Sequence, residues 1–566
     1  MAGYYNKNRK FYLEQLDIED VVCDLENNFE NTGADAVTNF KEALQWYDMI
    51  LENAGKICEE YIEPRAEAVD EKGAFFSDGV VSWAPETVEN MNMLAKAGYM
   101  GGTLPRKYGG LNLPLSVFNI IVEMVSQADA SLMNLFGLQD IAVTLYRFGN
   151  EEQKDRVLPK FCRGEVSGSM ALTEPDAGSD LQAVQLRALE KDGKWYLDGV
   201  KRFITNGCGD VSLVLARSEK GSKGGRGLSM FLYERYRDDN MQVRRIENKM
   251  GIHGSPTCEL QFNMAGAELV GRRKFGLIKY VMSLMNGARV AVSAQALGIA
   301  QQAYEESVKY ANEREQFGRK IVEMPMIYQI LKNMEVAIET SRILLYRTNH
   351  AVDIMDMYER KMESGEKVRK EYKYYKKLAD FLTPLSKFVI TEMANKVAYD
   401  AIQIHGGVGY MKDFPVERLY RDARITNIYE GTTQLQVVAC IGSITSGFFT
   451  EEMQKIEALE ISELSDEHTK TLKIFEDFNN ITQKVRELKN KEFTEFTAPY
   501  LVEMASIIFR LYLMLPVAEK YSEKRENLRY FLNESEANIF AHVKRINGLV
   551  EKFNGQTDNF RNGFFK

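Results

Sequence analysis

The spacing of apolar residues changes twice along the chain, and this change limits the possible folds more than any other feature. From about residue 37 to 164, apolar residues recur at helical spacing, as in Val117, Ile120 and Ile121. Short runs typical of β-strands, joined by glycine-rich links, then occupy about 165–275. Helical spacing returns after that. The pattern predicts an α+β chain whose domains follow the order helices, sheet, helices.

The C-terminal half divides further. Residues 276–447 are expected to form the second helical domain, with a charge-dense surface insertion near 358–378 between two core helices. Residues 448–566 are expected to fold as an additional helical domain, and 1–36 as an N-terminal extension. These boundaries divide the chain into three main domains and two added segments.

The most apolar run of the last domain is LVEMASIIFRLYLML, residues 501–515. It is interrupted by Arg510 and followed by Pro516, which is expected to stop the helix. Because the run is then too short to cross a bilayer, we expect a buried helix of a bundle, and membrane association is not expected.

A turn is expected within the β-rich region. The string WYLDGVKRFIT, residues 195–205, carries Asp198 and Gly199 between two strand-like halves. Asp-Gly is a common two-residue hairpin connection, so the string predicts two strands joined at this point.

Charge and cysteine usage exclude several classes of function. The chain carries 72 Lys and Arg against 81 Asp and Glu, a net charge of -9, and no basic block, which argues against nucleic acid as a partner. The six cysteines are scattered without a C-x-x-C pair, so neither a metal site nor a disulfide framework is expected. The N-terminus lacks the apolar segment of a secretory signal, and a cytoplasmic location is predicted.

The string MALTEPDAGSD, residues 170–180, places Thr173 and Ser179 around a turn at the start of the β region. Short hydroxyls and exposed backbone amides at such a turn can donate hydrogen bonds to a polar ring or a phosphate. Turn chemistry alone does not separate this interpretation from an ordinary capped turn. The chain has no G-x-G-x-x-G or P-loop string, so a nucleotide cofactor would be held outside those frameworks.

Five separated strings, in their order and spacing, resemble the acyl-CoA dehydrogenase family. They are MALTEPDAGSD, KRFITNG, REQFGRKI, QIHGGVGY and RDARITNIYEGTTQLQ. The resemblance covers about residues 37–440, and the remaining tail is similar to longer members, which include very-long-chain enzymes and bacterial aryl- or thioether-acyl-CoA dehydrogenases. It implies an N-terminal helical domain, a central β-barrel or sandwich domain, a C-terminal four-helix bundle and an extra C-terminal helical domain.

The resemblance implies that FAD lies between the β domain and the bundle. Phe203 stands where many members have Trp, and either ring can cover the flavin by stacking. The arginine of REQFGRKI suits the FAD pyrophosphate because its planar fork binds phosphate at two points. The implied FAD-binding residues are Met170, Leu172, Thr173, Ser179, Phe203, Ile204, Thr205, Arg314, Gln316, Phe317, Gln403, Gly406, Gly407, Thr432 and Gln434.

Part of this set implies an assembly. In the family, the segment that contains Gln403, Gly406 and Gly407 reaches the adenosine end of FAD in the neighbouring subunit. The chain is therefore expected to be at least a homodimer. The C-terminal tail is expected to cover the bundle surface through which shorter members form tetramers, so a dimer is favoured and a tetramer stays open.

Glu430 is the residue that the resemblance marks as catalytic. Taking a proton α to a thioester needs a carboxylate whose basicity is raised by a dry, apolar site. Ala288 occupies the position where some members carry the base on another helix, so that alternative is absent. The residues implied to bind substrate are Ser179, Asn286, Arg289, Tyr429, Glu430 and Gly431.

The implied activity is FAD-dependent α,β-dehydrogenation of an acyl-CoA to the trans-2-enoyl-CoA, a step of fatty acid β-oxidation in lipid metabolism. Electrons would pass to an electron-transfer flavoprotein. An acyl-CoA oxidase or a flavin monooxygenase on the same fold is an alternative, and so is a catalytically silent scaffold.

Overall fold

The computed structural model describes residues 3–30 and 37–553 of the chain. The first helical part packs around α6, in which every residue from Ser116 to Ala128 is buried. Asp129 ends α6 and caps α7, because its carboxylate accepts hydrogen bonds from the backbone amides of Ser131 (2.8 Å) and Leu132 (3.2 Å). The elements of this part are α1 (Lys7–Glu14), α2 (Glu19–Leu25), α3 (Phe40–Ile57), α4 (Ala66–Lys72), β1 (Phe75–Ser77), β2 (Val80–Ser82), α5 (Pro85–Lys96), α6 (Leu115–Ala128), α7 (Ala130–Phe136), α8 (Gln139–Phe148) and α9 (Glu151–Cys162).

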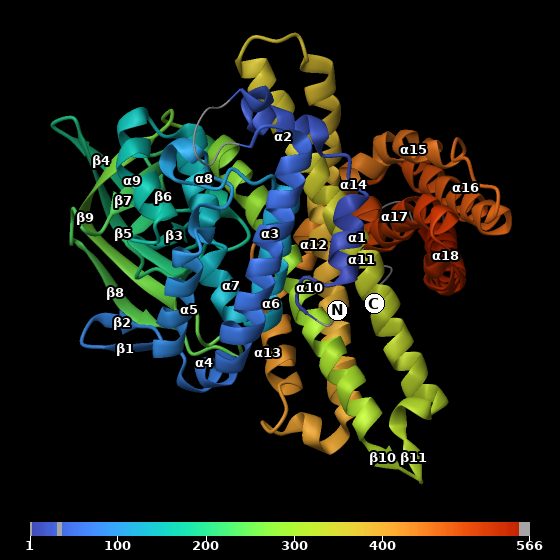
Figure 1. The fold of residues 1–566 in the computed structure, drawn as a ribbon. Coiled ribbons are helices and arrows are strands. Elements are labelled where there is room, and N and C mark those ends of the chain that lie inside the picture. The colour runs from blue at the N-terminus through green and yellow to red at the C-terminus, as the bar shows by residue number, and fades with distance from the viewer. Residues whose placement is uncertain (1–2, 31–36, 554–566) are drawn as a thin grey trace.

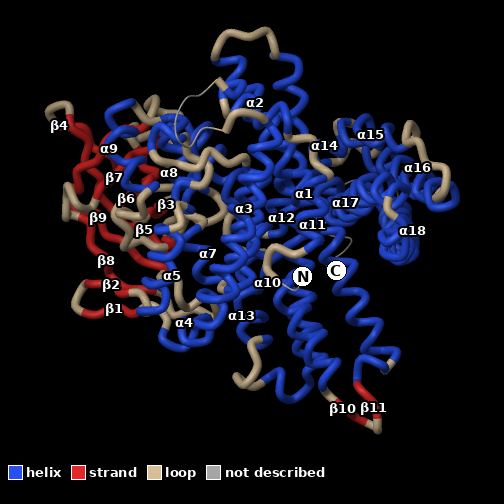
Figure 2. The backbone as a smooth tube through the Cα atoms, in the orientation of Figure 1, coloured by secondary structure: helices blue, strands red, loops and turns tan. Residues whose placement is uncertain are grey.

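A seven-stranded sheet follows and lies to one side of the helices (Figures 1 and 2). Its strands run in the order β3-β6-β4-β5-β9-β7, and β7 also pairs with β6, so the sheet closes on itself around an apolar interior. β8 pairs with β9. The strands are β3 (Gly168–Ala171), β4 (Arg187–Lys191), β5 (Lys194–Thr205), β6 (Val211–Arg217), β7 (Leu228–Glu234), β8 (Met241–Ile246) and β9 (Thr257–Val270).

The hairpin turn predicted at Asp198 and Gly199 is wrong, because both residues lie inside the single strand β5. A register shift after Leu197 makes this point a bulge, which Gly199 accommodates with φ of 139°. The hairpin turn is the preceding Asp-Gly pair, residues 192 and 193, between the paired Lys191 and Lys194. Both turn residues have positive φ, as a type I′ turn requires.

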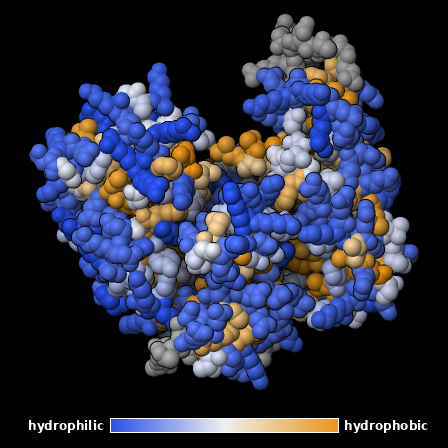
Figure 3. Space-filling model, turned by 90° about the horizontal axis from the view of Figure 1, so that it is seen from above, coloured by the Kyte–Doolittle hydropathy of each residue, from blue (hydrophilic) through white to orange (hydrophobic). Residues whose placement is uncertain are grey.

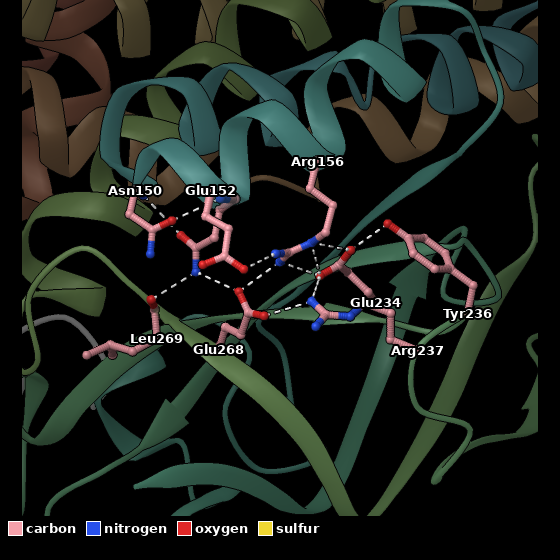
Figure 4. A network of polar contacts seen from close by, with 9 residues as sticks. Asn150, Glu152, Arg156, Glu234, Tyr236, Arg237, Glu268 and Leu269 are labelled. Atoms are coloured by element: carbon pink, nitrogen blue, oxygen red, sulfur yellow. Dashed lines mark hydrogen bonds and ion pairs between the residues drawn. The ribbon is translucent and has the colours of Figure 1, made fainter.

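A network of charged side chains ties α9 to strands β7 and β9 of the sheet (Figure 4). Arg156 donates hydrogen bonds to Glu234 (2.7 Å) and Glu268 (2.8 Å), and Gln153 donates to the Leu269 carbonyl (3.2 Å). Arg237 also donates to Glu268, at 2.7 Å. The network therefore joins the first helical part to β7 and β9.

Long helices form the second helical part. α10 packs against both α12 and α6, and α11 packs against α12. Residues 358–378 form the end of α11, a short connection and the start of α12, which project as the tip at the top of Figure 1. The predicted order of helices, sheet, helices is confirmed. The elements of this part are α10 (Met282–Glu313), β10 (Glu315–Gln316), β11 (Arg319–Lys320), α11 (Pro325–Glu363), α12 (Arg369–His405), α13 (Val416–Thr426) and α14 (Thr433–Thr445).

A buried ion pair anchors the N-terminal extension to the bundle. Arg9 of α1 lies 2.9 Å from Glu123 of α6, and Arg342 of α11 lies 2.9 Å from the same carboxylate. All three side chains are almost fully excluded from solvent.

The last part consists of α15 (Phe448–Met453), α16 (Ser465–Glu487), α17 (Lys491–Lys520) and α18 (Arg525–Phe553). The expectation that Pro516 stops the helix is wrong, because α17 continues past it to Lys520. Among the described residues, α17 alone is long and apolar enough to cross a membrane, yet 67% of its apolar window is buried. It packs against α14, α16 and α18, as a core helix of a bundle does. On the face shown in Figure 3, apolar residues form separate patches on a mostly hydrophilic surface.

Candidate active site

A cleft of about 720 Å³ lies where the two helical parts and the sheet meet. One wall comes from α7 and α8, a second from β5 and the loop after β3, and a third from α10 and the connection between α13 and α14. Its volume is in the range of cofactor and substrate sites, about 300–1,000 Å³. The structure brings eleven of the residues expected at the site to this cleft: Met170, Leu172, Thr173, Ser179, Phe203, Ile204, Thr205, Tyr429, Glu430, Gly431 and Thr432.

The β5 strand turns Phe203 toward the cleft. Its pairing with β9 is irregular between Lys201 and Ile204, and Phe203 there adopts φ of 60°. The ring is 52% exposed, and the Arg202 guanidinium lies 4.6 Å from its centre. A bulge of this kind re-aims one side chain out of the strand's alternation. The result is an aromatic face in the cleft, available to stack on a planar group.

Lys201 holds the loop after β3 in place, a role that the sequence did not reveal. Its buried ammonium donates to the carbonyl oxygen of Leu172 (2.7 Å) and to the carboxylate of Glu174 (2.9 Å). Glu174 also accepts hydrogen bonds from the backbone amides of Gln185 (2.7 Å) and Leu186 (2.9 Å). The loop that carries Thr173 and Ser179 is thus fixed by a buried ion pair rather than by turn residues alone.

Glu430 lies in the connection between α13 and α14. Both Glu430 and Gly431 adopt positive φ, 54° and 95°, and a non-glycine residue rarely does so without support from its surroundings. Lys387 of α12 supplies part of that support, because its ammonium donates to the carbonyl oxygens of Thr426 (3.0 Å) and Gly431 (2.8 Å). Gln436 donates to the same Gly431 oxygen at 2.8 Å.

Burial and the positive charges around Glu430 act on its pKa in opposite directions. Burial raises the pKa of Glu430 above its ordinary value, while the positive charges of Lys387 and Arg289 act to lower it. Burial also lowers the pKa of Lys387 to about 8. The net result is a carboxylate that is more basic than a solvated one and is held between a cleft and two cations.

Asp140 of α8 is a second carboxyl in the cleft that sequence reasoning missed. Burial and the negative charge of Glu430 raise the pKa of Asp140 to about 7. Nothing in the string around Asp140 or Lys387 marks either residue, because each acquires its neighbours from helices distant in the sequence.

Three expected residues lie beside the cleft rather than in its lining. The Arg289 guanidinium lies 3.4 Å from the Glu430 carbonyl oxygen and 3.2 Å from the Asn286 side-chain oxygen, while Gln434 is exposed on α14. Arg289 thus contacts the Glu430 backbone directly.

Six expected residues are not brought to the cleft. Gln316 and Phe317 belong to the β10–β11 hairpin, which projects from the lower end of the bundle in Figure 1, and Arg314 directly precedes it at the end of α10. The Phe317 side chain is 94% exposed. Gln403, Gly406 and Gly407 lie at the end of α12, beside the His405 ring that stacks at 4.3 Å on Tyr310 of α10. Within one chain, this end of the bundle is separate from the cleft.

The cleft residues fit a flavin. Phe203 offers an aromatic face, Thr173, Ser179 and Thr205 offer hydroxyls, and the fixed loop after β3 offers backbone groups at the same wall. A planar ring with polar edges needs this combination of stacking and hydrogen bonding.

Models of the acyl-CoA dehydrogenase N-terminal, middle and C-terminal domains match residues 46–165, 169–265 and 278–440, and an acyl-CoA dehydrogenase C-terminal model matches 445–556. The chain is 34% identical over 401 residues to a 3-(aryl)acrylate reductase of Clostridium sporogenes, covering 69% of this chain and 96% of that protein. It is 33% identical over 438 residues to a 3-methylmercaptopropionyl-CoA dehydrogenase of Ruegeria pomeroyi, covering 71% and 72%. An acyl-CoA dehydrogenase complexed with FAD from Bacillus anthracis has a similar structure, with a TM-score of 0.76, 25% identity and coverage of 89% and 88%.

Proposed function

The chain belongs to the acyl-CoA dehydrogenase family, and we propose that within this FAD-dependent oxidoreductase Glu430 is the base that takes the α-proton of the acyl-CoA. One observation carries the proposal. Glu430 lines the same cleft as Phe203 and Thr173, in surroundings that raise the pKa of its carboxyl group. The pKa of a base must be high enough to take a weakly acidic proton, and burial raises the pKa of the Glu430 carboxyl in this direction.

Each group around Glu430 has a task in this proposal. FAD, when bound, supplies the acceptor for the hydride that leaves the β-carbon. The cleft-lining residues that would hold it are Met170, Leu172, Thr173, Ser179, Ile204, Thr205 and Thr432, and the Phe203 ring would cover it. The backbone amide of Glu430 binds the thioester carbonyl, where it stabilises the charge that develops as the α-proton leaves. Arg289 and Lys387 keep the Glu430 backbone in its strained conformation.

Exposed apolar side chains at the lower end of the bundle support a homodimer. Phe317 is 94% exposed, Tyr410 is 78% exposed and Met326 is 78% exposed, and such residues favour burial against another surface. In the proposed dimer, Arg314, Gln316, Phe317, Gln403, Gly406 and Gly407 complete the FAD site around the adenosine and pyrophosphate. A tetramer is the alternative assembly.

Asn286, Arg289 and Gly431 bind the thioester end of CoA, and Gln434 contacts the cofactor.

The electron acceptor proposed is an electron-transfer flavoprotein, which is supported by likeness to a chain in the solved structure described as the electron transferring flavoprotein of Acidaminococcus fermentans. That chain is 32% identical, with a TM-score of 0.60 and coverage of 73% of this chain and 98% of that chain.

A cytoplasmic location stays a prediction. Two of the similar proteins are named as reductases, which supports the reverse reaction as a second candidate, with Glu430 returning the proton to the α-carbon.

Substitution of Glu430 by Gln tests the base. The variant should keep its yellow flavin and bind acyl-CoA, but bleaching of the flavin by acyl-CoA should slow by roughly a hundred- to ten-thousandfold. Glu451→Gln, at an exposed acid outside the cleft, is the matched control and should bleach normally. Wild-type bleaching by Glu430→Gln would show that another residue takes the proton.

A further inference from the structure

Two polar atoms in the wall of the cleft formed by α7 and α8 have no hydrogen-bond partner among the described residues. They are the side-chain nitrogen Nδ2 of Asn134 and the carboxyl oxygen Oδ2 of Asp140. Both residues line the cleft that holds Glu430, and the Asn134 side chain is only 7% exposed. Buried polar atoms in proteins are usually paired, so two unpaired ones in one wall call for a partner that binds there.

The orientation of the Asn134 amide follows from its neighbours. The Ala130 carbonyl oxygen can only accept, so the Gln295 side-chain nitrogen, at 2.9 Å, must donate to it. The same nitrogen lies 2.8 Å from Asn134 and donates to its Oδ1 atom. The Tyr429 hydroxyl, 3.2 Å away, contacts that oxygen too. The Nδ2 group of Asn134 is therefore the free end, and it can only donate a hydrogen bond.

The Asp140 carboxyl is confined by α10. A Cβ atom placed on Gly287 would lie 3.1 Å from Oδ2 of Asp140, so the close approach of the helix depends on glycine at this position. The raised pKa of Asp140, about 7, reflects the same burial together with the charge of Glu430. Asp140 lines the cleft, and its unpaired Oδ2 can act as an acceptor, or as a donor when it carries the proton.

We propose that the acyl chain of the substrate carries a hydroxyl group beyond its β-carbon, and that Asp140 and Asn134 determine this specificity. The inference rests on the proposed function of the cleft. A hydroxyl can donate to Asp140 and accept from Asn134, whereas an alkyl chain would leave both groups unpaired. Sites built around such polar groups discriminate strongly against analogues that lack the matching atom.

The test compares acyl-CoA thioesters that differ only in a terminal hydroxyl or methyl group. The purified flavoprotein is mixed under anaerobic conditions with 4-hydroxybutyryl-CoA or pentanoyl-CoA, and with 5-hydroxypentanoyl-CoA or hexanoyl-CoA. For each thioester, the rate of flavin bleaching gives the rate constant at saturation divided by the half-saturating concentration. At one or both lengths the hydroxyl compound should be favoured by about tenfold or more.

Variants then locate the preference. Asp140→Leu should remove it or reverse it, while Asp140→Asn, which keeps a hydrogen-bonding side chain of the same size, should retain part of it. Asp155→Leu, in α9 and outside the cleft lining, is the matched control and should keep the wild-type ratio.

The outcomes distinguish failure of this inference from failure of the proposed function. If alkyl thioesters bleach the flavin as well as their hydroxyl counterparts at both lengths, the inference is overturned while the dehydrogenase function stands. If 5-aminopentanoyl-CoA is preferred to the hydroxyl compound, the pocket selects a cation and the hydroxyl assignment is wrong. If no thioester bleaches the flavin, the proposed function fails instead. The wild-type panel decides these points even if a variant does not fold.

Discussion

The Lys387 ammonium lies 2.8 Å from the carbonyl oxygen of Gly431, the residue that directly follows Glu430. Lys387 comes from the middle of α12 and is fully buried. A buried amine that binds two backbone oxygens of one short connection fixes its conformation. We therefore treat Lys387 as a positioning residue for the proposed base.

Substitution of Lys387 by Met should slow flavin reduction by about ten- to a hundredfold, because a small displacement of a reacting group costs rates of this order. The expected loss is in the rate constant at saturating acyl-CoA, with FAD content unchanged. Lys373→Met, at an exposed position of the same helix, is the control. An unaltered rate constant in Lys387→Met would remove Lys387 from the mechanism.

The rate of flavin reduction should rise with pH through the raised pKa of Glu430, because only the deprotonated carboxylate can take the α-proton. Lys387 carries a positive charge that acts to lower this pKa. Its removal in Lys387→Met should therefore move the rising limb to higher pH. Stopped-flow rates between about pH 5 and 9 locate the rising limb in the wild type and in Lys387→Met. If the rising limb of Lys387→Met stays in place, or moves to lower pH, the assignment of Glu430 as the base is contradicted.

Arg314→Ala should lower the FAD content of the purified protein and weaken the dimer, because a guanidinium that binds the pyrophosphate also joins the two subunits. The flavin absorbance per protein and the mass from light scattering measure the two effects. Arg319→Ala, on β11 of the exposed hairpin that follows Arg314, is the control. Full flavin content in Arg314→Ala would show that this hairpin does not contact the cofactor.

The C-terminal helices should determine the size of the assembly. Phe449 packs in the core between Phe381 of α12, with ring centres 5.4 Å apart, and Phe478 of α16, 5.3 Å apart. A chain that ends at Gly442 lacks this cover and exposes an apolar bundle surface. Light scattering should show a dimer for the whole chain, and tetramers or aggregates for the shortened one. A tetramer of the whole chain would refute the idea.

The sequence by itself determined the order of helices and strands, because the period of apolar residues reflects which face of each element is buried. It also indicated Glu430, Phe203 and the loop after β3 through strings that resemble those of the acyl-CoA dehydrogenase family. These residues lie together because the strings fall at the ends of elements that meet at one cleft.

Tertiary structure decided what depends on partners distant in the chain. Asp-Gly occurs twice within eight residues, and strand pairing, not composition, made the first pair the turn and the second a bulge. Pro516 remained inside α17 because packing outweighed the loss of one backbone hydrogen bond. Asp140 and Lys387 look like ordinary helix residues in sequence. Their altered pKa values arise only in the folded chain: burial and the charge of Glu430 together raise the pKa of Asp140, whereas burial lowers the pKa of Lys387 against the opposing charge of Glu430.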